Sequence, residues 1–459
     1  MKQQLVHELS PIPAPTDVCA ALQGLPYRIF FDSAESEGKY ARYSFVAADP
    51  DRVVTSKSGR TEIRGRDGQL HHADDSSNAL LSLRTILSEM DIATVDGLPP
   101  FQGGVAGYIG YEFGTSLERI AAVGTDDLAI PDLCFGVYDT VFAWDHLARR
   151  AWLIAPNVER QDIYLQRLGK HFKDAPAGVS RSGKKPDVRS SLSRHEYRAA
   201  IQQIREYIAA GDIFQANFAQ RFHAALETKP WDLYVALRQL NPAPFACFFE
   251  AGGLSVVSAS PERFMQVQAN RAETRPIKGT RPRMDSQALD LASASELLAS
   301  AKDNAEHVMI VDVLRNDLSR VCTPGSVEVG KLAELESHPT VHHLVSTITG
   351  ELRSGCDSID LLVASIPGGS ITGAPKVRAM EIIAELEPVR RDIYCGCLAY
   401  ITPDGTMDSS IVIRTFLAKE GSVYFSAGGG IVADSDPDLE FEETMHKAAA
   451  LFSALEMAG

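Results

Sequence analysis

The chain of 459 residues is too long for a single minimal core, and its length fits two or three domains or one large interleaved body. Its composition, with 45% hydrophobic and 23% charged residues, is typical of an ordinary soluble globular protein. A formal net charge of -15 argues against a nucleic-acid partner, because such partners are bound by basic surfaces that neutralise phosphates.

The N-terminal segment, residues 1–15, has no basic stretch followed by an apolar core and a small-residue cleavage site. No apolar run in the chain approaches the length of a membrane span. We therefore expect a cytoplasmic protein that does not bind a membrane. The 7 cysteines are odd in number and scattered, which favours reduced thiols over a disulfide framework.

Short apolar runs alternate with turn residues up to about residue 172, as in 27–31 and 136–142, and this pattern predicts antiparallel strands. Segment 101–111 has spaced glycines, as a dinucleotide-binding fingerprint does, but no helix-capping signal follows where that fingerprint requires one. We therefore predict a tightly packed strand. A stretch rich in Pro, Gly, Ser and Lys follows. We predict a sheet-rich N-terminal subdomain at 1–175, a linker at 176–192 and a second domain at 193–459.

The second domain is predicted to begin with a helix. A capping box occupies 193–196, apolar residues follow at helical spacing, and Gly211 ends the pattern. At 213–222 the period changes to two, which predicts a strand with Phe214 on an apolar core face and Gln215 on a polar face. A polar strand face inside a large protein is a candidate site wall.

The segment 275–283 holds a lysine between two prolines and a glycine, ringed by arginines. The prolines fix the backbone and Gly279 permits close approach, so Lys278 is presented in a defined position. Positive neighbours favour a bound anion and lower the pKa of a lysine towards a nucleophilic amine, although a solvated basic loop is the alternative. Just upstream, Glu262 lies at the end of a predicted strand. Its carboxylate is interpreted either as part of a surface ion pair or as an acid catalyst.

Two predicted helices each show a pair of carboxylates on one face. Asp303 and Glu306 stand at i and i+3 in the helical pattern of 302–312, and Glu440 and Glu443 have the same spacing near the C-terminus. Two such helices can hold one magnesium ion between them, with water and substrate oxygens completing the octahedron. The alternative is that both pairs are solvated.

Two glycine-rich segments suggest sites for an anion. Segment 367–376 runs into a predicted helix and offers exposed backbone amides, but it lacks the Gly-Lys-Ser/Thr ending of a nucleotide-binding P-loop. Segment 428–430 is placed between a strand at 423–426 and the C-terminal acidic helix. Arg414, at the end of the predicted strand 411–413, can give a bidentate contact to a carboxylate.

The chain resembles the chorismate-utilising enzymes, densely over about 193–455 and more thinly before that. The resemblance implies an α+β fold of large antiparallel sheets packed as a sandwich with helices on the outside and interleaved halves, and it makes 193–459 a chorismate-binding catalytic domain. The motifs that carry it are, in order, Gly211 to Asn217, Ser260 to Arg263, Pro276 to Thr280, Lys302 to Glu306, Pro367 to Lys376, Asp408 to Thr415 and Gly428 to Glu443.

Lys278 distinguishes the branches of this family. Members that form anthranilate typically carry alanine there, whereas Pro-Ile-Lys-Gly-Thr resembles the members that convert chorismate and ammonia into 4-amino-4-deoxychorismate for the synthesis of 4-aminobenzoate and folate. Members that activate water have a lysine base where this chain has Gln215. The resemblance therefore implies ammonia addition, with anthranilate formation as the alternative. A catalytically silent binding subunit would be expected to lack Lys278, Glu306 or Glu443, and all three are present.

The resemblance also implies roles for single residues. Lys278 is the covalent nucleophile that attacks C2 of chorismate, and Glu262 is the general acid that protonates the leaving C4 hydroxyl. The implied Mg²⁺ ligands are Glu306 and Glu443, with Asp303 and Glu440 in support. The implied substrate contacts are Gln215, Thr280, His343, Thr372, Gly373, Tyr400, Arg414, Gly428, Gly429, Gly430 and Lys447.

Two further ligands or partners are implied. Ammonia is expected from a separate glutamine amidotransferase subunit, because no cysteine lies in a Gly-x-Cys-x-Gly elbow. A tryptophan pocket, as in relatives, is expected between Ser33 and Tyr43 on one side and Pro244 and Phe245 on the other. The alternative is that these aromatic residues are ordinary core.

Overall fold

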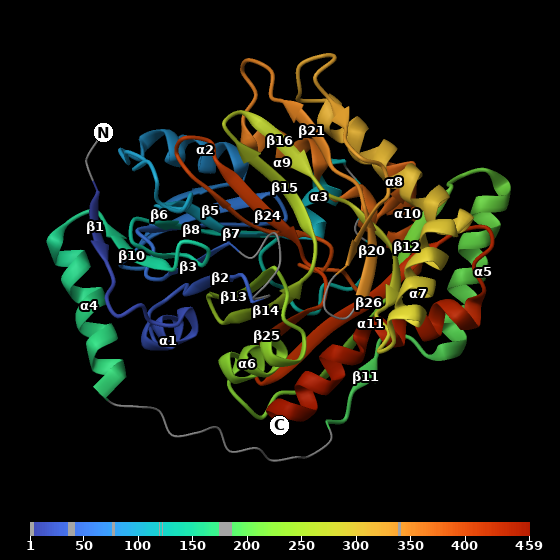
Figure 1. The fold of residues 1–459 in the computed structure, drawn as a ribbon, viewed down its shortest axis with the longest axis horizontal. Coiled ribbons are helices and arrows are strands. Elements are labelled where there is room, and N and C mark those ends of the chain that lie inside the picture. Colours follow the sequence, from blue (N-terminus) through green and yellow to red (C-terminus); the bar gives the residue numbers. More distant parts are fainter. Residues whose placement is uncertain are drawn as a thin grey trace.

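The computed structural model describes residues 4–34, 42–75, 79–118, 120–121, 123–173, 186–337 and 341–459. Two large antiparallel sheets carry this part of the chain, and helices lie on their outer faces (Figure 1). The prediction of an α+β sandwich is confirmed. Of the predicted linker at 176–192, residues 176–185 lie outside the described residues.

The first sheet combines strands from before and after the predicted linker, which meet where Asp32 pairs with Ala246. Across the sheet, the described strands are β1 (Leu5–Glu8), β10 (Arg150–Ala155), β9 (Val141–Asp145), β3 (Tyr43–Ala47), β2 (Ile29–Asp32), β13 (Phe245–Ala251), β14 (Leu254–Ser260), β25 (Thr415–Lys419), β26 (Ser422–Ile431), β12 (Gln215–Ala225) and β11 (Arg189–Ser190), with β22 (Gly373–Ala374) also on β12.

The second sheet is interleaved in the same way, and its halves meet where Gly107 pairs with Ala399. Its described strands are β18 (Glu328–Val329), β21 (Ile348–Glu351), β16 (Arg271–Thr274), β15 (Arg263–Gln268), β24 (Met407–Ile411), β23 (Cys397–Ile401), β7 (Gly104–Ile109), β8 (Leu133–Tyr138), β4 (Arg52–Lys57), β5 (Arg60–Gly65) and β6 (Leu70–Asp74). A small third sheet contains β17 (Ile277–Pro282), β20 (Val341–Val345) and β19 (Glu334–Ser337).

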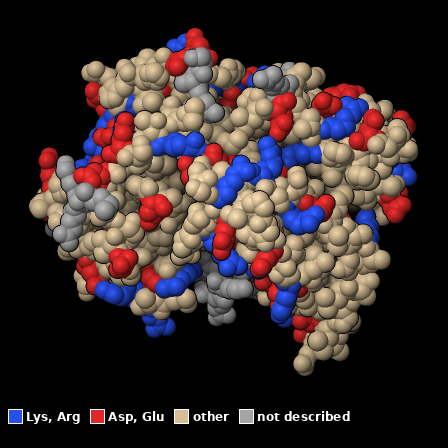
Figure 2. Space-filling model, turned by 90° about the horizontal axis from the view of Figure 1, so that it is seen from above, with Lys and Arg blue, Asp and Glu red and all other residues tan. Residues whose placement is uncertain are grey.

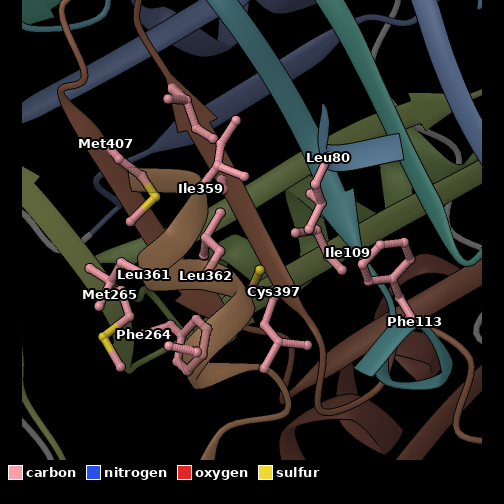
Figure 3. Packing of buried hydrophobic residues seen from close by; sticks show 14 of the residues in the cluster. Leu80, Ile109, Phe113, Phe264, Met265, Ile359, Leu361, Leu362, Cys397 and Met407 are labelled. Atoms are coloured by element: carbon pink, nitrogen blue, oxygen red, sulfur yellow. The ribbon is translucent and has the colours of Figure 1, made fainter. Parts of the chain in front are cut away.

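Apolar clusters between the sheets and on their outer faces hold the sandwich together, and a further cluster packs α5 and α10 against β12 and β26. One lies between the sheets, where Phe45 and Phe249 of the first sheet pack with Tyr108 and Leu398 of the second. The outer face of the first sheet is covered by α1, α4, α6 and α11. The outer face of the second is covered by α2, α8 and α9, and Figure 3 shows residues of α9 and α2 over this sheet.

The helices are α1 (Pro15–Ala21), α2 (Ala79–Glu89), α3 (Tyr111–Leu117), α4 (Val158–Lys173), α5 (Arg194–Ala210), α6 (Pro230–Leu240), α7 (Gln287–Ala299), α8 (Ala301–Ser319), α9 (Ser358–Ser365), the 3₁₀ turn η1 (Gly369–Ile371), α10 (Lys376–Leu386) and α11 (Pro437–Ala458). Among the described residues, no helix combines the length and the apolar character needed to cross a membrane. The seven cysteines are free thiols, as predicted.

Several local predictions are confirmed. Ser193 and Glu196 form both halves of the capping box of α5, and Gly211 ends that helix with φ 86°. The carboxylate pattern at 302–312 lies within α8, and Asp436 caps α11. On the face shown in Figure 2, basic and acidic side chains are interspersed.

Two local predictions are wrong. Phe214 does not belong to an apolar core face, because it is 71% exposed and precedes β12. The polar residues Gln215 and Asn217 do lie inside the protein, as expected for a site wall. The glycines at 428–430 do not form a loop. They lie inside β26 and pair with β12. Because these residues have no side chains, side chains from other elements can lie close to the β26 backbone.

Gly107 provides a test of the predicted close strand packing. A Cβ at this position would lie 2.0 Å from the carbonyl oxygen of Cys134 on β8. We expect Gly107→Ala to lower the free energy of unfolding by about 1 to 3 kcal/mol or more, because β7 must move away from β8.

The control is Gly169→Ala in α4, where a Cβ would meet no atom within 4 Å. This change should raise the free energy of unfolding by about 0.5–1 kcal/mol, since alanine favours the helix. Equilibrium urea denaturation measures both. Equal effects of the two substitutions would contradict the close-packing argument.

Candidate active site

The predicted lysine loop is a bulged strand, β17. Its register against β20 shifts between Lys278 and Thr280, so Gly279 forms the bulge. Gly279 has φ +76°, and a Cβ there would lie 2.9 Å from Leu297 of α7 and 3.3 Å from the Cβ of Asp303 of α8. Glycine at this position lets both helices pack against the strand that carries the lysine.

The side chain of Lys278 ends on a carboxylate of α8. Its Nζ lies 2.6 Å from Oε1 of Glu306, and the two side chains are only 17% and 16% exposed. The arginines around the lysine are neutralised by neighbouring acids and are not left free for an anion. Their pairs are Arg275 with Glu336, Arg281 with Glu296 and Asp303, and Arg283 with Asp290.

Glu262 is a buried acid between β14 and β15. Burial raises its pKa to about 7, although the charge of Lys278, the Ile277 N–H, the Ser370 hydroxyl and the charge of Arg414 act in the opposite direction. Ser370 donates to Oε1 of Glu262 at 3.5 Å. The structure therefore brings Glu262 together with Lys278 and Arg414, and a carboxyl with this pKa is half protonated near neutral pH.

Carboxylates of both acidic helices come close to the glycines of β26. A Cβ on Gly429 would lie 3.4 Å from Glu440 and 3.5 Å from Glu443, both of α11. A Cβ on Gly430 would lie 2.9 Å from Glu306 of α8. Among the described residues, β25 pairs with β26 at Ser422–Phe425, so this pairing ends before the glycine stretch, and α11 contacts β26.

A second lysine repeats the contact made by Lys278. Lys447 Nζ lies 2.6 Å from Oε1 of Glu443 one turn earlier in α11, and it donates to the carbonyl of Gly428 at 3.1 Å. Burial raises the pKa of Glu443, but the ammonium groups of Lys447, Lys278 and Lys302 outweigh it, so the net pKa is below the usual value. Burial raises the pKa of Glu440, which accepts from Ser435 at 2.6 Å.

Gln215 is a buried amide without a partner. Its side chain is inaccessible to solvent, and neither its nitrogen nor its oxygen has a hydrogen-bond partner among the described residues. The Cβ position of Gly430 lies 2.4 Å from Nε2 of Gln215 and 2.9 Å from Oε1 of Glu306, which places the amide beside the acids. An unsatisfied buried amide in such a position has hydrogen bonds to offer a ligand or a water.

The acids around β26 fit a divalent cation by their chemistry. Glu306, Glu440 and Glu443 supply the hard carboxylate oxygens that Mg²⁺ prefers, and Gln215 adds an unpartnered amide oxygen. No three His, Cys, Asp or Glu side chains converge as a ready ligand set within the described residues. Glu306 and Glu443 are each paired with a lysine, and Asp303 with Arg281.

The predicted anion-binding loop at 367–376 is held by its own contacts. The Thr372 hydroxyl donates to the carbonyl of Gly368, and the Thr372 carbonyl accepts from Asn217 of β12. Gly373 has φ +149°, and a Cβ there would lie 2.1 Å from the carbonyl of Gln215. Thr372 and Gly373 thus serve to seat the loop against β12, and Ser370 of the same loop is what reaches Glu262.

Thr280 and His343 lie near Lys278 on the small sheet, with Thr280 Oγ1 2.9 Å from His343 Nδ1. Tyr400 lies elsewhere. It lines a cavity of about 570 Å³ with Ser33, Tyr43, Pro244 and Phe245, the four residues of the expected tryptophan pocket. The sequence alone does not reveal this, because Tyr400 is brought to that cavity by the pairing of β23 with β7.

Sequence reasoning missed a buried pair that holds the site together. Arg391 donates to Glu387 at 2.6 and 2.9 Å, and to the carbonyls of Ile371 at 3.1 Å and Asn217 at 2.5 Å. Glu387 also accepts from the backbone of Ala219. The pair therefore ties the glycine-rich loop to β12. Its i, i+4 spacing is visible in the sequence, but such pairs usually lie on solvated helix ends.

Comparison with known proteins identifies relatives of the whole chain. A family model described as chorismate binding enzyme matches residues 27–453. Aminodeoxychorismate synthase component 1 of Escherichia coli (strain K12) is 40% identical over 437 residues, which cover 95% of this chain and 94% of that protein. Anthranilate synthase component 1 of Pseudomonas aeruginosa is 37% identical over 466 residues, covering 98% and 94%.

A solved structure shows the same arrangement. The crystal structure of anthranilate synthase component I from Streptococcus pneumoniae TIGR4 superposes with a TM-score of 0.79 at 32% identity, covering 91% of this chain and 93% of that one. Both the fold and the sequence thus align over nearly the full length.

Arg391 provides a test of how the site is held. We expect Arg391→Met to lower the free energy of unfolding by about 3–5 kcal/mol, because Glu387 is left as a buried, unpaired charge. The double variant Glu387→Gln with Arg391→Met should recover much of this loss, since no buried charge remains. Urea denaturation measures both, and a double variant no more stable than the single one would refute the buried-charge explanation.

Proposed function

This chain belongs to the family of chorismate-binding enzymes, and from that premise we propose that it adds ammonia to chorismate to form 4-amino-4-deoxychorismate. The observation that carries the proposal is the position of Lys278. Its amine lies on Glu306 and near the buried acid Glu262, and a lysine here is the feature expected of the ammonia-adding branch. The E. coli relative, which is 40% identical, has the name of that activity.

The proposed reaction divides one difficult displacement into two. Lys278 forms a bond to C2, the ring electrons shift, and the C4 hydroxyl leaves as water with a proton from Glu262. Ammonia then bonds to C4, the electrons shift back, and the C2–nitrogen bond breaks to return the amine of Lys278. The enolpyruvyl group is retained, so no later elimination is required of His343.

The buried position of Glu262 supports its role as the acid. A carboxyl with a pKa of about 7 is largely protonated below neutral pH, and it can then donate to a departing hydroxyl. Ser370 and Arg414 hold it from two sides. The proposed role of Arg414 and Lys447 is to bind substrate carboxylates, because Arg414 is a cation near Glu262 and Lys447 is a cation beside Glu443.

Magnesium is part of the proposal. Glu306 and Glu443 would hold the ion, with Glu440 beside them and Asp303 in support. When bound, Mg²⁺ supplies positive charge that lets an anionic substrate approach these carboxylates. Gln215, a neutral amide, cannot deprotonate water as a lysine would, and this favours ammonia over water as the nucleophile.

The ammonia source is proposed to be a second protein component, a glutamine amidotransferase. The names of the relatives as component 1 support a partner. We also propose tryptophan as the ligand of the cavity lined by Ser33, Tyr43, Pro244 and Phe245, with Tyr400 added to that set. Its volume of about 570 Å³ is ample for one indole side chain.

The product of the purified chain tests the proposed reaction. With chorismate, Mg²⁺ and ammonium, we expect 4-amino-4-deoxychorismate by mass spectrometry. Lys278→Ala should lower the rate at least about 100-fold, because the nucleophile is lost. Fluorescent anthranilate as the main product would favour the alternative activity, and near-normal turnover by the variant would exclude covalent catalysis by Lys278.

The pH dependence tests Glu262. An acid must be protonated, so we expect kcat/KM for chorismate to fall above a pH of about 7, by about tenfold per pH unit well above it. The measurement needs a constant concentration of free ammonia. Glu262→Gln should be slower and should lose this limb of the profile. A wild-type profile that stays flat from pH 6 to about 9 would contradict the role.

A further inference from the structure

Two lysines already occupy the carboxylates that would hold the metal. Lys278 lies 2.6 Å from Glu306, and Lys447 lies 2.6 Å from Glu443. Building on the proposed function, we propose that these ammonium groups are internal counter-ions that Mg²⁺ displaces. Metal binding would then release the nitrogen of Lys278 from Glu306 and make it available to the substrate.

The geometry makes the two cations competitors. Each lysine lies on the oxygen Oε1 of its glutamate, so a metal ion bound to that carboxylate would stand within a few ångströms of an ammonium group. Like charges at such a distance repel, and the repulsion is stronger at the Lys278–Glu306 pair, whose side chains are 17% and 16% exposed, than at the Lys447–Glu443 pair, whose side chains are 44% and 54% exposed. Each carboxylate can therefore pair with its lysine or bind the metal ion, but not both at once.

The two lysines differ in what keeps them in place after release. Lys447 has a second acceptor, the carbonyl of Gly428 at 3.1 Å, and would stay near β26. Among the described residues, Glu306 is the hydrogen-bond acceptor of Lys278. The charge of Lys278 also acts on Glu262 and on Glu443, and of these two Glu443 would be occupied by the metal. Release from Glu306 would therefore leave Lys278 facing the acid that the proposed reaction uses.

A consequence is that the metal-free enzyme holds its nucleophile in an ion pair. The pair is formed across two elements, β17 and α8, and Gly279 fixes their close packing. Lys278 then has two successive roles. As an ammonium group it neutralises Glu306 before the metal arrives. After release it gives one proton to solvent and attacks the substrate as a neutral amine.

Removal of the competitor tests the inference. We expect Lys278→Met to bind Mg²⁺ at least about tenfold more tightly than the wild type in isothermal titration calorimetry without chorismate, because the competing charge is gone. The matched control is Lys170→Met on α4, which removes the same charge from an exposed site remote from β26 in Figure 1. This control should leave the Mg²⁺ affinity unchanged.

An unchanged or weaker affinity in Lys278→Met would overturn the inference, as would the absence of Mg²⁺ binding in all variants. A second measurement on the wild type covers the case in which the variant fails to fold. Acetylation of Lys278, followed by mass spectrometry, should increase severalfold on addition of Mg²⁺, whereas acetylation of Lys170 stays constant. Constant acetylation of Lys278 would refute release, and the product assay would still test the proposed reaction separately.

Discussion

Charge balance among partly buried carboxylates is the constraint on which the site depends. Glu306, Glu440 and Glu443 meet around the glycines of β26, and unpaired acids in that position would repel one another. Lys278 and Lys447 each neutralise one of them at 2.6 Å. The same principle governs the surrounding framework, where Arg391 lies on Glu387 and Lys376 lies on the buried Asp317. Cations in this region therefore determine which backbone segments can come together.

Local features of the site could be predicted from the sequence because they depend on neighbours along the chain. The capping box of α5, the helical spacing of Asp303 and Glu306, and the cap of α11 by Asp436 need only residues three or four positions apart. The fold class followed from a resemblance, and the two interleaved sheets agree with it.

Features that depend on pairing between distant segments could not be predicted in this way. The acids that neutralise the arginines around Lys278 come from α7, α8 and β19. Tyr400 was assigned to the wrong cavity for the same reason, because alternation within β23 does not say which cavity a strand face will line. The glycines at 428–430 look like a turn in sequence, yet their lack of side chains serves a strand that two helices approach closely.

The interleaving of the two sheets has a consequence for how the chain acquires its structure. The first sheet is completed only when Asp32 pairs with Ala246, and the second only when Gly107 pairs with Ala399. Contacts of such long sequence separation carry a large loop-closure cost and slow the folding of a protein. During synthesis, the edges of β2 and β7 remain without their partners until the later strands leave the ribosome. The two sheets can therefore be completed only after the later strands have been synthesised, and until then one edge of β2 and one edge of β7 are open to pairing with another chain.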